Sequence, residues 1–185
     1  MSWRVAGLLV AALVQPALAQ DRVSEPDAYR TENYRSPVPV TLAGARVLTT
    51  AEAEAIWRAK TAVFIDVLPR APKPKGLPPS TVWRDKPRHD IPGSIWLPDT
   101  GYGILAPATE DYLRQGLARA SGGNRQAMLV IYCLSDCWMS WNAAKRALTY
   151  GYTDVAWYPE GTDGWEHANL PLADAQPESR PDESN

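Results

Sequence analysis

The chain contains two cysteines, Cys133 and Cys137, and both lie in one stretch, residues 128–141, with the sequence M-L-V-I-Y-C-L-S-D-C-W-M-S-W. A cysteine thiolate attacks sulfur, and a second cysteine nearby can attack a persulfide or mixed disulfide that forms on the first. We therefore predict that Cys133 is a sulfur-handling or redox nucleophile. Cys137 is then its resolving partner, which releases the bound group by forming an intramolecular disulfide.

Two other interpretations of the pair stay open. A buried cysteine can simply be a small apolar core residue. The pair can also be a structural disulfide, because an oxidising compartment tends to convert an uncoupled pair of thiols into one. Helical geometry would place two Cα atoms four residues apart at about 6 Å, within reach of a disulfide. The sequence does not decide whether Cys133 and Cys137 are bonded.

The residues before Cys133 predict a buried strand, because residues 128–132 form a short apolar run rich in β-branched and aromatic side chains. Strands of this kind belong to parallel sheets covered by helices, whose sites form beyond the carboxyl ends of the strands. Cys133 therefore precedes a loop and a helix N-terminus, where amides and the helix dipole favour a thiolate or persulfide. Around it we expect a binding site formed by Leu134, Ser135, Asp136, Trp138 and Ser140.

Helices and buried strands are predicted to alternate along the chain. The expected helices cover residues 51–60, residues 110–120 with Thr109 as N-cap, and residues 140–150 with Ser140 as N-cap. The expected strands cover residues 62–67, 128–132 and 155–158, with a short strand after the turn at residues 89–93. This alternation predicts an α/β domain with a central, mostly parallel sheet flanked by helices.

Asp66 ends the strand predicted over residues 62–67, on the side of the sheet where Cys133 lies, and it can either orient loop amides or cap a turn. Residues 69–87 predict a long loop with six prolines, of a length typical of functional lids or disordered segments. We expect Trp83 to dock this loop and to contribute to binding. Its basic residues either supply positive charge to the cysteines or form a solvated surface; they are Lys73, Lys75, Arg84, Lys86 and, just after it, Arg88.

The beginning of the chain predicts export. Arg4 precedes a short apolar core, residues 5–14, and Ala17-Leu18-Ala19 is a typical cleavage pattern. We expect residues 1–19 to be a signal peptide that directs a soluble protein to the periplasm. Residues 20–46 are predicted to form an arm that packs on the domain, with a short strand near residues 38–40, and residues 173–185 to form a frayed polar tail.

Several functions are disfavoured by the sequence. A net charge of −2 argues against a nucleic-acid partner. The spacing of His89 and His167 relative to the cysteines matches no zinc pattern, and Cys137 is not followed by the histidine of a c-type haem site. The chain has no glycine-rich nucleotide loop and nothing that indicates a pyrroloquinoline quinone (PQQ) site. We therefore expect neither a metal nor a bound cofactor.

Four pieces of the chain, in order, resemble a rhodanese-like domain over residues 47–172. They are F-I-D-V at 64–67, I-P-G at 91–93, V-I-Y-C at 130–133 and G-T-D-G-W at 161–165. The resemblance implies a single α/β domain with Cys133 in the position of the sulfurtransferase nucleophile. The basic residues that rhodaneses often place in the cysteine loop are absent, and Asp136 would raise the thiol pKa. Thiosulfate-type turnover is therefore not expected to be efficient.

The stretch C-L-S-D-C-W-M-S-W-N-A-A-K-R-A-L, followed by W-Y-P-E-G-T-D-G-W, is similar to an exported family, the "PQQ-dependent catabolism-associated CXXCW motif" proteins. That family's motif has two residues between its cysteines, whereas this chain has three. The resemblance implies an association with bacterial oxidation of alcohols by quinoprotein dehydrogenases.

Two functions follow from these resemblances. The first is an enzyme for sulfur transfer or thiol–disulfide exchange that serves PQQ-dependent alcohol oxidation, with a sulfane-sulfur or thiol substrate. The second is a catalytically degenerate binding module with a structural disulfide, in which Trp83, Trp138 and the long loop recognise a partner. The expected partners are a periplasmic quinoprotein dehydrogenase, a cytochrome or a transport component.

Overall fold

The computed structural model describes residues 23–71, 74–78, 80–82, 84 and 86–180. The expected signal peptide, residues 1–19, lies outside these ranges, as do Lys73 and Trp83. Within them, no helix is long and apolar enough to cross a membrane.

A five-stranded sheet with all its neighbours parallel forms the centre of the protein, in the order β1-β6-β5-β2-β4. The strands are β1 (Arg46–Val47), β2 (Val63–Asp66), β4 (Ile95–Trp96), β5 (Leu129–Tyr132) and β6 (Val155–Tyr158). All residues of β5 and β6 are buried because helices cover both faces of the sheet. The α/β fold with a central parallel sheet is confirmed.

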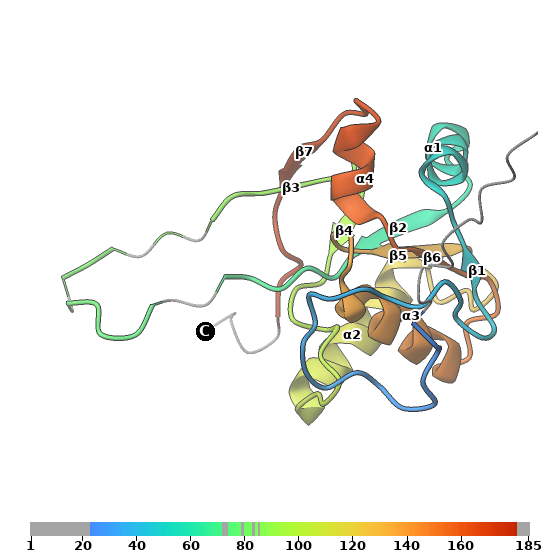
Figure 1. Ribbon diagram of the computed structural model, residues 1–185. Helices are drawn as coiled ribbons and strands as arrows, with labels where there is room; N and C mark the ends of the chain where they lie inside the picture. The colour runs from blue at the N-terminus through green and yellow to red at the C-terminus, as the bar shows by residue number, and fades with distance from the viewer. Residues whose placement is uncertain (1–22, 72–73, 79, 83, 85, 181–185) are drawn as a thin grey trace, which may run out of the picture.

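The four helices of the described residues lie in two layers, one on each side of this sheet (Figure 1). On one side, α2 (Pro107–Ala120) and α3 (Trp138–Thr149) pack with the inward side chains of β5, among them Leu129 and Ile131. On the other side, α1 (Thr50–Ala59) and α4 (Gly161–His167) pack on Val130 and Tyr132. Alternate residues of one strand therefore enter two separate cores.

The helix starts differ from those expected in two places. Helix α2 begins at Pro107, three residues before the expected start, because proline suits a first-turn position. Helix α3 begins at Trp138, with Cys137 as its N-cap residue. Ser140 is therefore not the N-cap but lies inside the first turn, where its hydroxyl donates to the Cys137 carbonyl over 2.9 Å. Cys137 is consequently held by the helix itself.

The N-terminal arm, residues 23–45, runs along α3 (Figure 1). The buried side chain of Asn142 holds its backbone: Oδ1 accepts from Arg30 N over 2.9 Å and Nδ2 donates to Arg30 O over 2.8 Å. The strand expected near residues 38–40 is absent. Instead, a single antiparallel bridge joins Arg35 to Cys137. The extended part of the arm thus lies next to the cysteine loop.

A second, two-stranded antiparallel sheet joins β3 (Arg88–Asp90) to β7 (Ala173–Ala175). After β7 the chain continues along β4, where Pro177 bridges Trp96 and Glu178 N donates to Trp96 O over 2.9 Å. The expectation of a frayed tail is therefore wrong for residues 173–180. Their backbone forms hydrogen bonds with the edges of β3 and β4, which would otherwise be unpaired.

Candidate functional site

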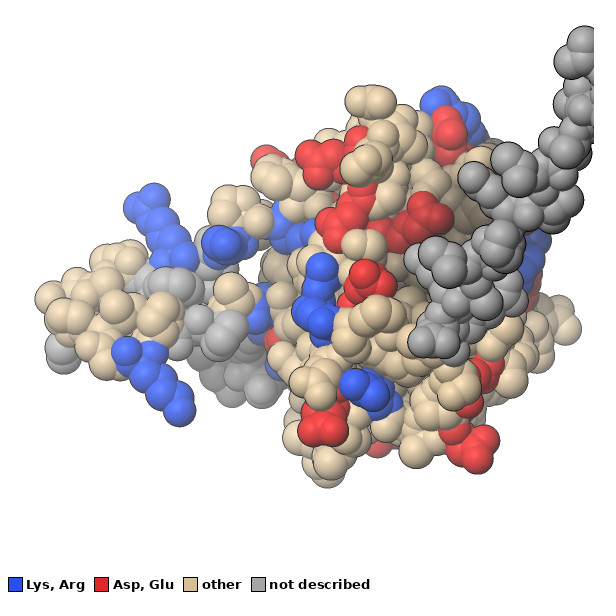
Figure 2. All heavy atoms as spheres, viewed as in Figure 1, with Lys and Arg blue, Asp and Glu red and all other residues tan. Residues whose placement is uncertain are grey.

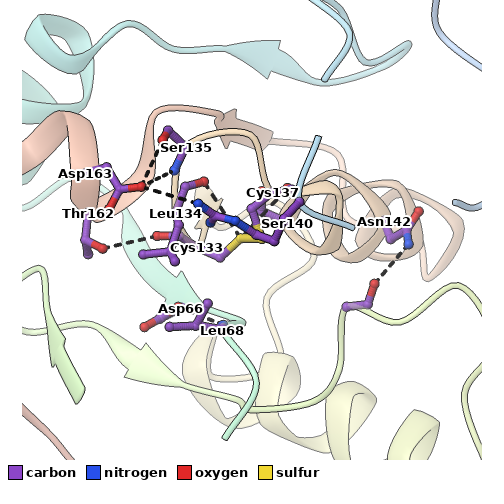
Figure 3. The surroundings of a disulfide bond; sticks show 12 residues. Asp66, Leu68, Cys133, Leu134, Ser135, Cys137, Ser140, Asn142, Thr162 and Asp163 are labelled. Atoms are coloured by element: carbon purple, nitrogen blue, oxygen red, sulfur yellow. Dashed lines mark hydrogen bonds and ion pairs between the residues drawn. A yellow bond between two sulfur atoms is a disulfide. The ribbon is translucent and has the colours of Figure 1, made fainter. Parts of the chain in front are cut away.

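Cys133 and Cys137 form a disulfide, with 6.4 Å between their Cα atoms (Figure 3). The two residues are 0% and 2% exposed, so the bond is buried. Cys133 follows directly on β5, at the carboxyl end of the middle strand of the sheet. The bond joins that strand end to the N-terminus of α3.

Helix α4 holds the loop between the two cysteines. Ser135 donates to Asp163 Oδ2 twice, from its backbone N over 3.1 Å and from its hydroxyl over 2.8 Å. Asp136 has a φ of 49°, so the loop turns sharply there through the left-handed region. Figure 3 shows Thr162 and Asp163 on one side of the loop and Ser140 on the other. The loop is thereby fixed on two sides.

Gly161, the first residue of α4, lies against the Cys133 carbonyl. It has a φ of 52°, and a Cβ at this position would overlap the Cys133 carbonyl group. The close approach lets Thr162 N donate to Cys133 O over 3.0 Å. A glycine is required here both by the backbone conformation and by the lack of space.

Asp66 is the last residue of β2, pairs in register with Tyr132 just before Cys133, and is fully buried. Its Oδ1 accepts from Leu68 N over 2.9 Å and its Oδ2 from Arg88 Nε over 2.6 Å. Arg88 also donates from Nη1 to Thr162 Oγ1 over 3.2 Å. Burial raises the pKa of Asp66, and the Arg88 guanidinium opposes that shift. Asp66 caps a turn, which is one of the two roles expected for it, and is linked to the Cys133 carbonyl through Arg88 and Thr162.

A second buried carboxylate, Asp90 on β3, lies near Asp66. Burial, and then the charge of Asp66, raise the pKa of Asp90 to about 7. Its Oδ2 has no hydrogen-bond partner among the described residues. A backbone hydrogen bond to the carboxyl group and the charge of Arg88 oppose this rise in pKa, but burial outweighs them and favours the protonated form. The site therefore combines one buried arginine with two buried carboxyl groups, of which Asp66 pairs with the arginine.

A cavity of about 620 Å³ opens beside the cysteine loop at Leu134. Its other lining residues come from the two ends of the long loop, from β3 and β4, and from α4; they include Leu68, Arg70, Lys86, Arg88, Trp96, Thr162, Asp163 and Glu166. Figure 2 shows basic side chains on the projecting loop and acidic ones gathered over α4. The cavity thus has a basic wall and an acidic wall.

Of the long loop, residues near its two ends line the cavity. Between its ends, the described part of the long loop projects away from the body of the domain in Figure 1. Lys86 and Arg88 reach the cavity, whereas Lys75 and Arg84 do not line it. Trp138, which we expected in the binding site, is 1% exposed and so does not present a surface to a partner. Its indole Nε1 donates to Ser36 Oγ and Pro37 O, both over 3.1 Å, beneath the arm.

Four residues of the site were not singled out as site residues from the sequence: Arg35, Arg88, Thr162 and Asp163. Thr162 and Asp163 lie inside the G-T-D-G-W motif, so their place near the cysteine could have been found from it. Arg88 was considered only as a loop cation, and no local pattern marks Arg35. Within the described ranges, no three His, Cys, Asp or Glu side chains are grouped to hold a metal ion.

Comparisons with known proteins agree with the family suggested by the motifs. The sequence profile of the rhodanese-like domain matches residues 49–168. No curated protein matches the chain significantly.

Several solved structures resemble the chain at low identity. A thiosulfate sulfurtransferase from Pseudomonas aeruginosa is 20% identical with a TM-score of 0.49, over 72% of this chain and 21% of that one. An uncharacterized protein from Saccharomyces cerevisiae is 22% identical with a TM-score of 0.41, over 67% of this chain and 92% of that one. The polysulfide-sulfur transferase of Wolinella succinogenes, a homodimer, is 17% identical with a TM-score of 0.45, over 72% and 82%.

This chain therefore spans about a fifth of the length of the Pseudomonas protein. The profile match is the stronger finding, because it covers well over half of the 185 residues and includes β2, β5, α3 and α4. On this ground the chain belongs to the rhodanese-like domain family.

Proposed function

We propose that this protein is an exported member of its family that performs sulfur transfer or thiol–disulfide exchange at Cys133 and Cys137, in the service of PQQ-dependent alcohol oxidation. The observation that supports the chemistry is the bond between the two cysteines at the carboxyl end of β5. Export and the link to alcohol oxidation rest on residues 1–19 and on the likeness of residues 133–148 to the CXXCW family.

The chemistry balances as a cycle between a dithiol and a disulfide. In its reduced form, the Cys133 thiolate takes a sulfane sulfur from a donor and becomes a persulfide. The Cys137 thiolate then attacks Cys133 Sγ, so that the S–S bond of the persulfide breaks, hydrosulfide leaves and the disulfide forms. A protein or small dithiol restores the two thiols and is itself oxidised to a disulfide. In exchange without sulfane sulfur, this last step reduces the protein, and the disulfide of a second partner, reduced in turn to a dithiol, restores the Cys133–Cys137 bond.

The first test is the redox state of the protein, cleaved after Ala19, across a series of glutathione ratios, followed by thiol labelling and intact mass. We expect a bond that reduces near the potentials of known exchange proteins, or a gain of one sulfur by the reduced protein after exposure to thiosulfate or polysulfide. Cys133→Ser is expected to abolish activity, whereas Cys137→Ser, which lacks the resolving thiol, traps on Cys133 the species formed with the sulfur donor. Full turnover by Cys133→Ser would refute the proposal.

A second candidate is a binding module with a structural disulfide. Its support is the burial of both cysteines, together with the absence of basic residues from the loop between them. In this case the bond resists reduction at any physiological ratio, and no sulfur is taken up. Affinity capture then recovers a quinoprotein dehydrogenase, a cytochrome or a transport component. A readily reduced bond without any such partner would count against the binding module.

A further inference from the structure

The arm pairs with the cysteine loop as a short antiparallel ladder. Ser36 N donates to Asp136 O over 3.1 Å, and Trp138 N donates to Tyr34 O over 2.9 Å. These two bonds lie on either side of Arg35 and Cys137, which therefore form a non-hydrogen-bonded antiparallel pair. In such a pair the two side chains lie on the same face, directly opposite each other. Position 35 of the arm therefore faces Cys137.

The distance between the Cβ atoms of residues 35 and 137 is suitable for a disulfide between two cysteines at these positions. In a pair of this kind the two Cβ atoms are about 4.5–5.5 Å apart, close to the roughly 3.5–4.5 Å of a disulfide. The Arg35 side chain also extends from there to Asp163, with 3.9 Å between Nη2 and Oδ2. It therefore reaches the same carboxylate oxygen that accepts from Ser135 of the loop between the two cysteines. A thiol in place of Arg35 would approach Cys137 rather than Cys133.

Resting on the function proposed above, we infer that the backbone edge Asp136–Trp138 is the docking edge for an extended, cysteine-bearing segment of a partner protein. This segment displaces Tyr34–Ser36 of the arm and brings its cysteine to the position of Arg35. Addition of an extended peptide to an exposed strand edge is a common mode of recognition. The arm occupies this edge in the resting protein.

Displacement of the arm gives a thiol access to the buried bond. The disulfide is at most 2% exposed, so an attacking thiol cannot reach it unless a covering segment moves. The arm lies outside the family match at residues 49–168. Next to the loop, Arg35 of the arm forms an ion pair with Asp163. Both side chains are about half exposed, and such pairs contribute little stability. Within the displaced segment only Tyr34 packs, partly buried, against the core, whereas Trp165 of α4 is a fully buried core residue.

The arm also indicates which sequence the edge accepts. The Tyr34 ring packs edge-on against Tyr102 with 5.4 Å between centroids, and its hydroxyl accepts from Gly103 N over 3.0 Å. On the other side of position 35, Ser36 Oγ accepts from the Trp138 indole. A partner segment that uses both contacts has an aromatic residue before its cysteine and a serine or threonine after it.

The chemical step follows from this register. The partner thiolate attacks Cys137 Sγ, the Cys133–Cys137 bond breaks, and Cys133 leaves as a thiolate while a mixed disulfide forms at Cys137. A second thiolate of the partner then attacks the partner sulfur of the mixed disulfide and releases Cys137. Two electrons pass from the partner dithiol to this protein, which ends as a dithiol, and the partner ends with a disulfide.

The test uses a peptide with the sequence of residues 31–39 and the change Arg35→Cys, T-E-N-Y-C-S-P-V-P, against the oxidised full chain. Its control is a scrambled peptide of the same composition. The tethered arm competes at an effective concentration on the order of millimolar. The rates are therefore also measured on Ser36→Pro, which lacks the N–H that bonds Asp136 O.

We expect the matched peptide to form a mixed disulfide at least about tenfold faster than the scrambled one, and the ratio to grow in Ser36→Pro because the edge is freed. After alkylation, mass mapping is expected to place the peptide on Cys137 and the alkyl group on Cys133. Equal rates for the two peptides, or attachment to Cys133, would overturn the inference.

A second test places the cysteine in the protein's own arm, so that its result does not depend on how tightly a peptide binds. Under glutathione exchange, Arg35→Cys in the full chain is expected to bond Cys137 and leave Cys133 alkylatable. Ser36→Cys is the matched control, because alternate residues of a strand point to opposite faces, and it should leave the native bond intact. A new bond to Cys133, or no new bond, contradicts the register.

Reduction by dithiothreitol separates this inference from the proposed function. If dithiothreitol reduces the folded protein but the two peptides react alike, exchange chemistry stands and the docking edge is wrong. If neither dithiothreitol nor either peptide reduces the bond in the folded protein, both ideas fail.

Discussion

Arg88 binds Asp66 in the interior of the protein, with 2.6 Å between Nε and Oδ2 and with side chains that are 9% and 0% exposed. The same guanidinium contacts Thr162 Oγ1. One side chain of β3 therefore joins the end of β2 to the start of α4, and Thr162 N in turn holds the Cys133 carbonyl. Arg88 thus links the buried Asp66 to the residue that holds the Cys133 carbonyl.

Replacement of Arg88 by methionine is expected to lower the free energy of unfolding by about 3–5 kcal/mol, because it leaves Asp66 buried without its cation. Urea unfolding followed by tryptophan fluorescence measures the change. Arg58→Met is the matched control: Arg58 pairs with Glu54 on the surface of α1 over 2.7 Å, and its loss should cost less than about 1 kcal/mol. Equal losses for the two variants would refute a structural role for the buried pair.

Stability should fall as the pH rises from about 4 to about 7. The pKa of Asp90 is raised from 3.8 to about 7, so in this window the folded protein keeps a proton that the unfolded chain has lost. Asp66, whose pKa is also raised, acts in the same direction. The contribution of Asp90 is full below its unfolded pKa, is lost as the pH rises through its folded pKa, and amounts to a few kcal/mol by linkage.

Chemical unfolding at several pH values between 4 and 8 tests this dependence. Asp90→Asn should flatten the curve and raise stability at pH 8 relative to the unchanged protein, since an amide needs no proton to remain neutral. An unchanged slope in Asp90→Asn would show that other groups cause the pH dependence.

Gly161→Ala should distort the cysteine loop as well as destabilise the protein. The new Cβ overlaps the Cys133 carbonyl group, and overpacking adds about 1–3 kcal/mol to the roughly 1–2 kcal/mol cost of the left-handed backbone. Gly151→Ala is the control, because Gly151 also has a positive φ, 88°, but nothing lies within 4 Å of its added Cβ. Gly161→Ala should also change the rate of reduction by dithiothreitol, whereas Gly151→Ala should not.

Reduction of the disulfide should leave the domain folded. The bond closes a loop of very few residues, and by the chain-entropy relation it contributes less than the roughly 3 kcal/mol of a 15-residue loop. Urea unfolding of the oxidised and reduced protein measures the difference, with the double variant Cys133→Ser/Cys137→Ser as the reference for the unbonded state. Unfolding upon reduction would show that the bond is needed for the fold and would exclude a redox cycle in the folded state.

The sequence predicted best the parts of the site that follow from local patterns. The apolar run of β5 placed Cys133 at a strand end, and the acidic end of β2 placed Asp66 near it. The start of α3 was missed because Cys137, which makes no side-chain cap hydrogen bond, precedes apolar Trp138 and Met139, so no N-cap signal marks the helix. Local patterns suffice wherever a single strand determines the position of a residue.

The remaining parts depend on contacts between distant segments. Arg35 meets Cys137, and Arg88 meets both Asp66 and Ala175, across separations that no periodicity reveals. Backbone pairing at strand edges is also nearly independent of side-chain type, so neither the arm nor β7 has a distinctive composition. These two segments lie beside the cysteine loop and the cavity, which is why the environment of the site was predicted less well than its centre.

The position of the arm has a consequence for biogenesis. Because Cys133 and Cys137 are only four residues apart, their thiols can meet in a newly made chain long before the parallel sheet assembles, since local contacts form fastest. Once residues 34–36 lie over the loop, an oxidase acting on the finished protein has the same difficulty of access as a reductant. The disulfide is therefore introduced most readily before residues 34–36 of the arm pair with the loop.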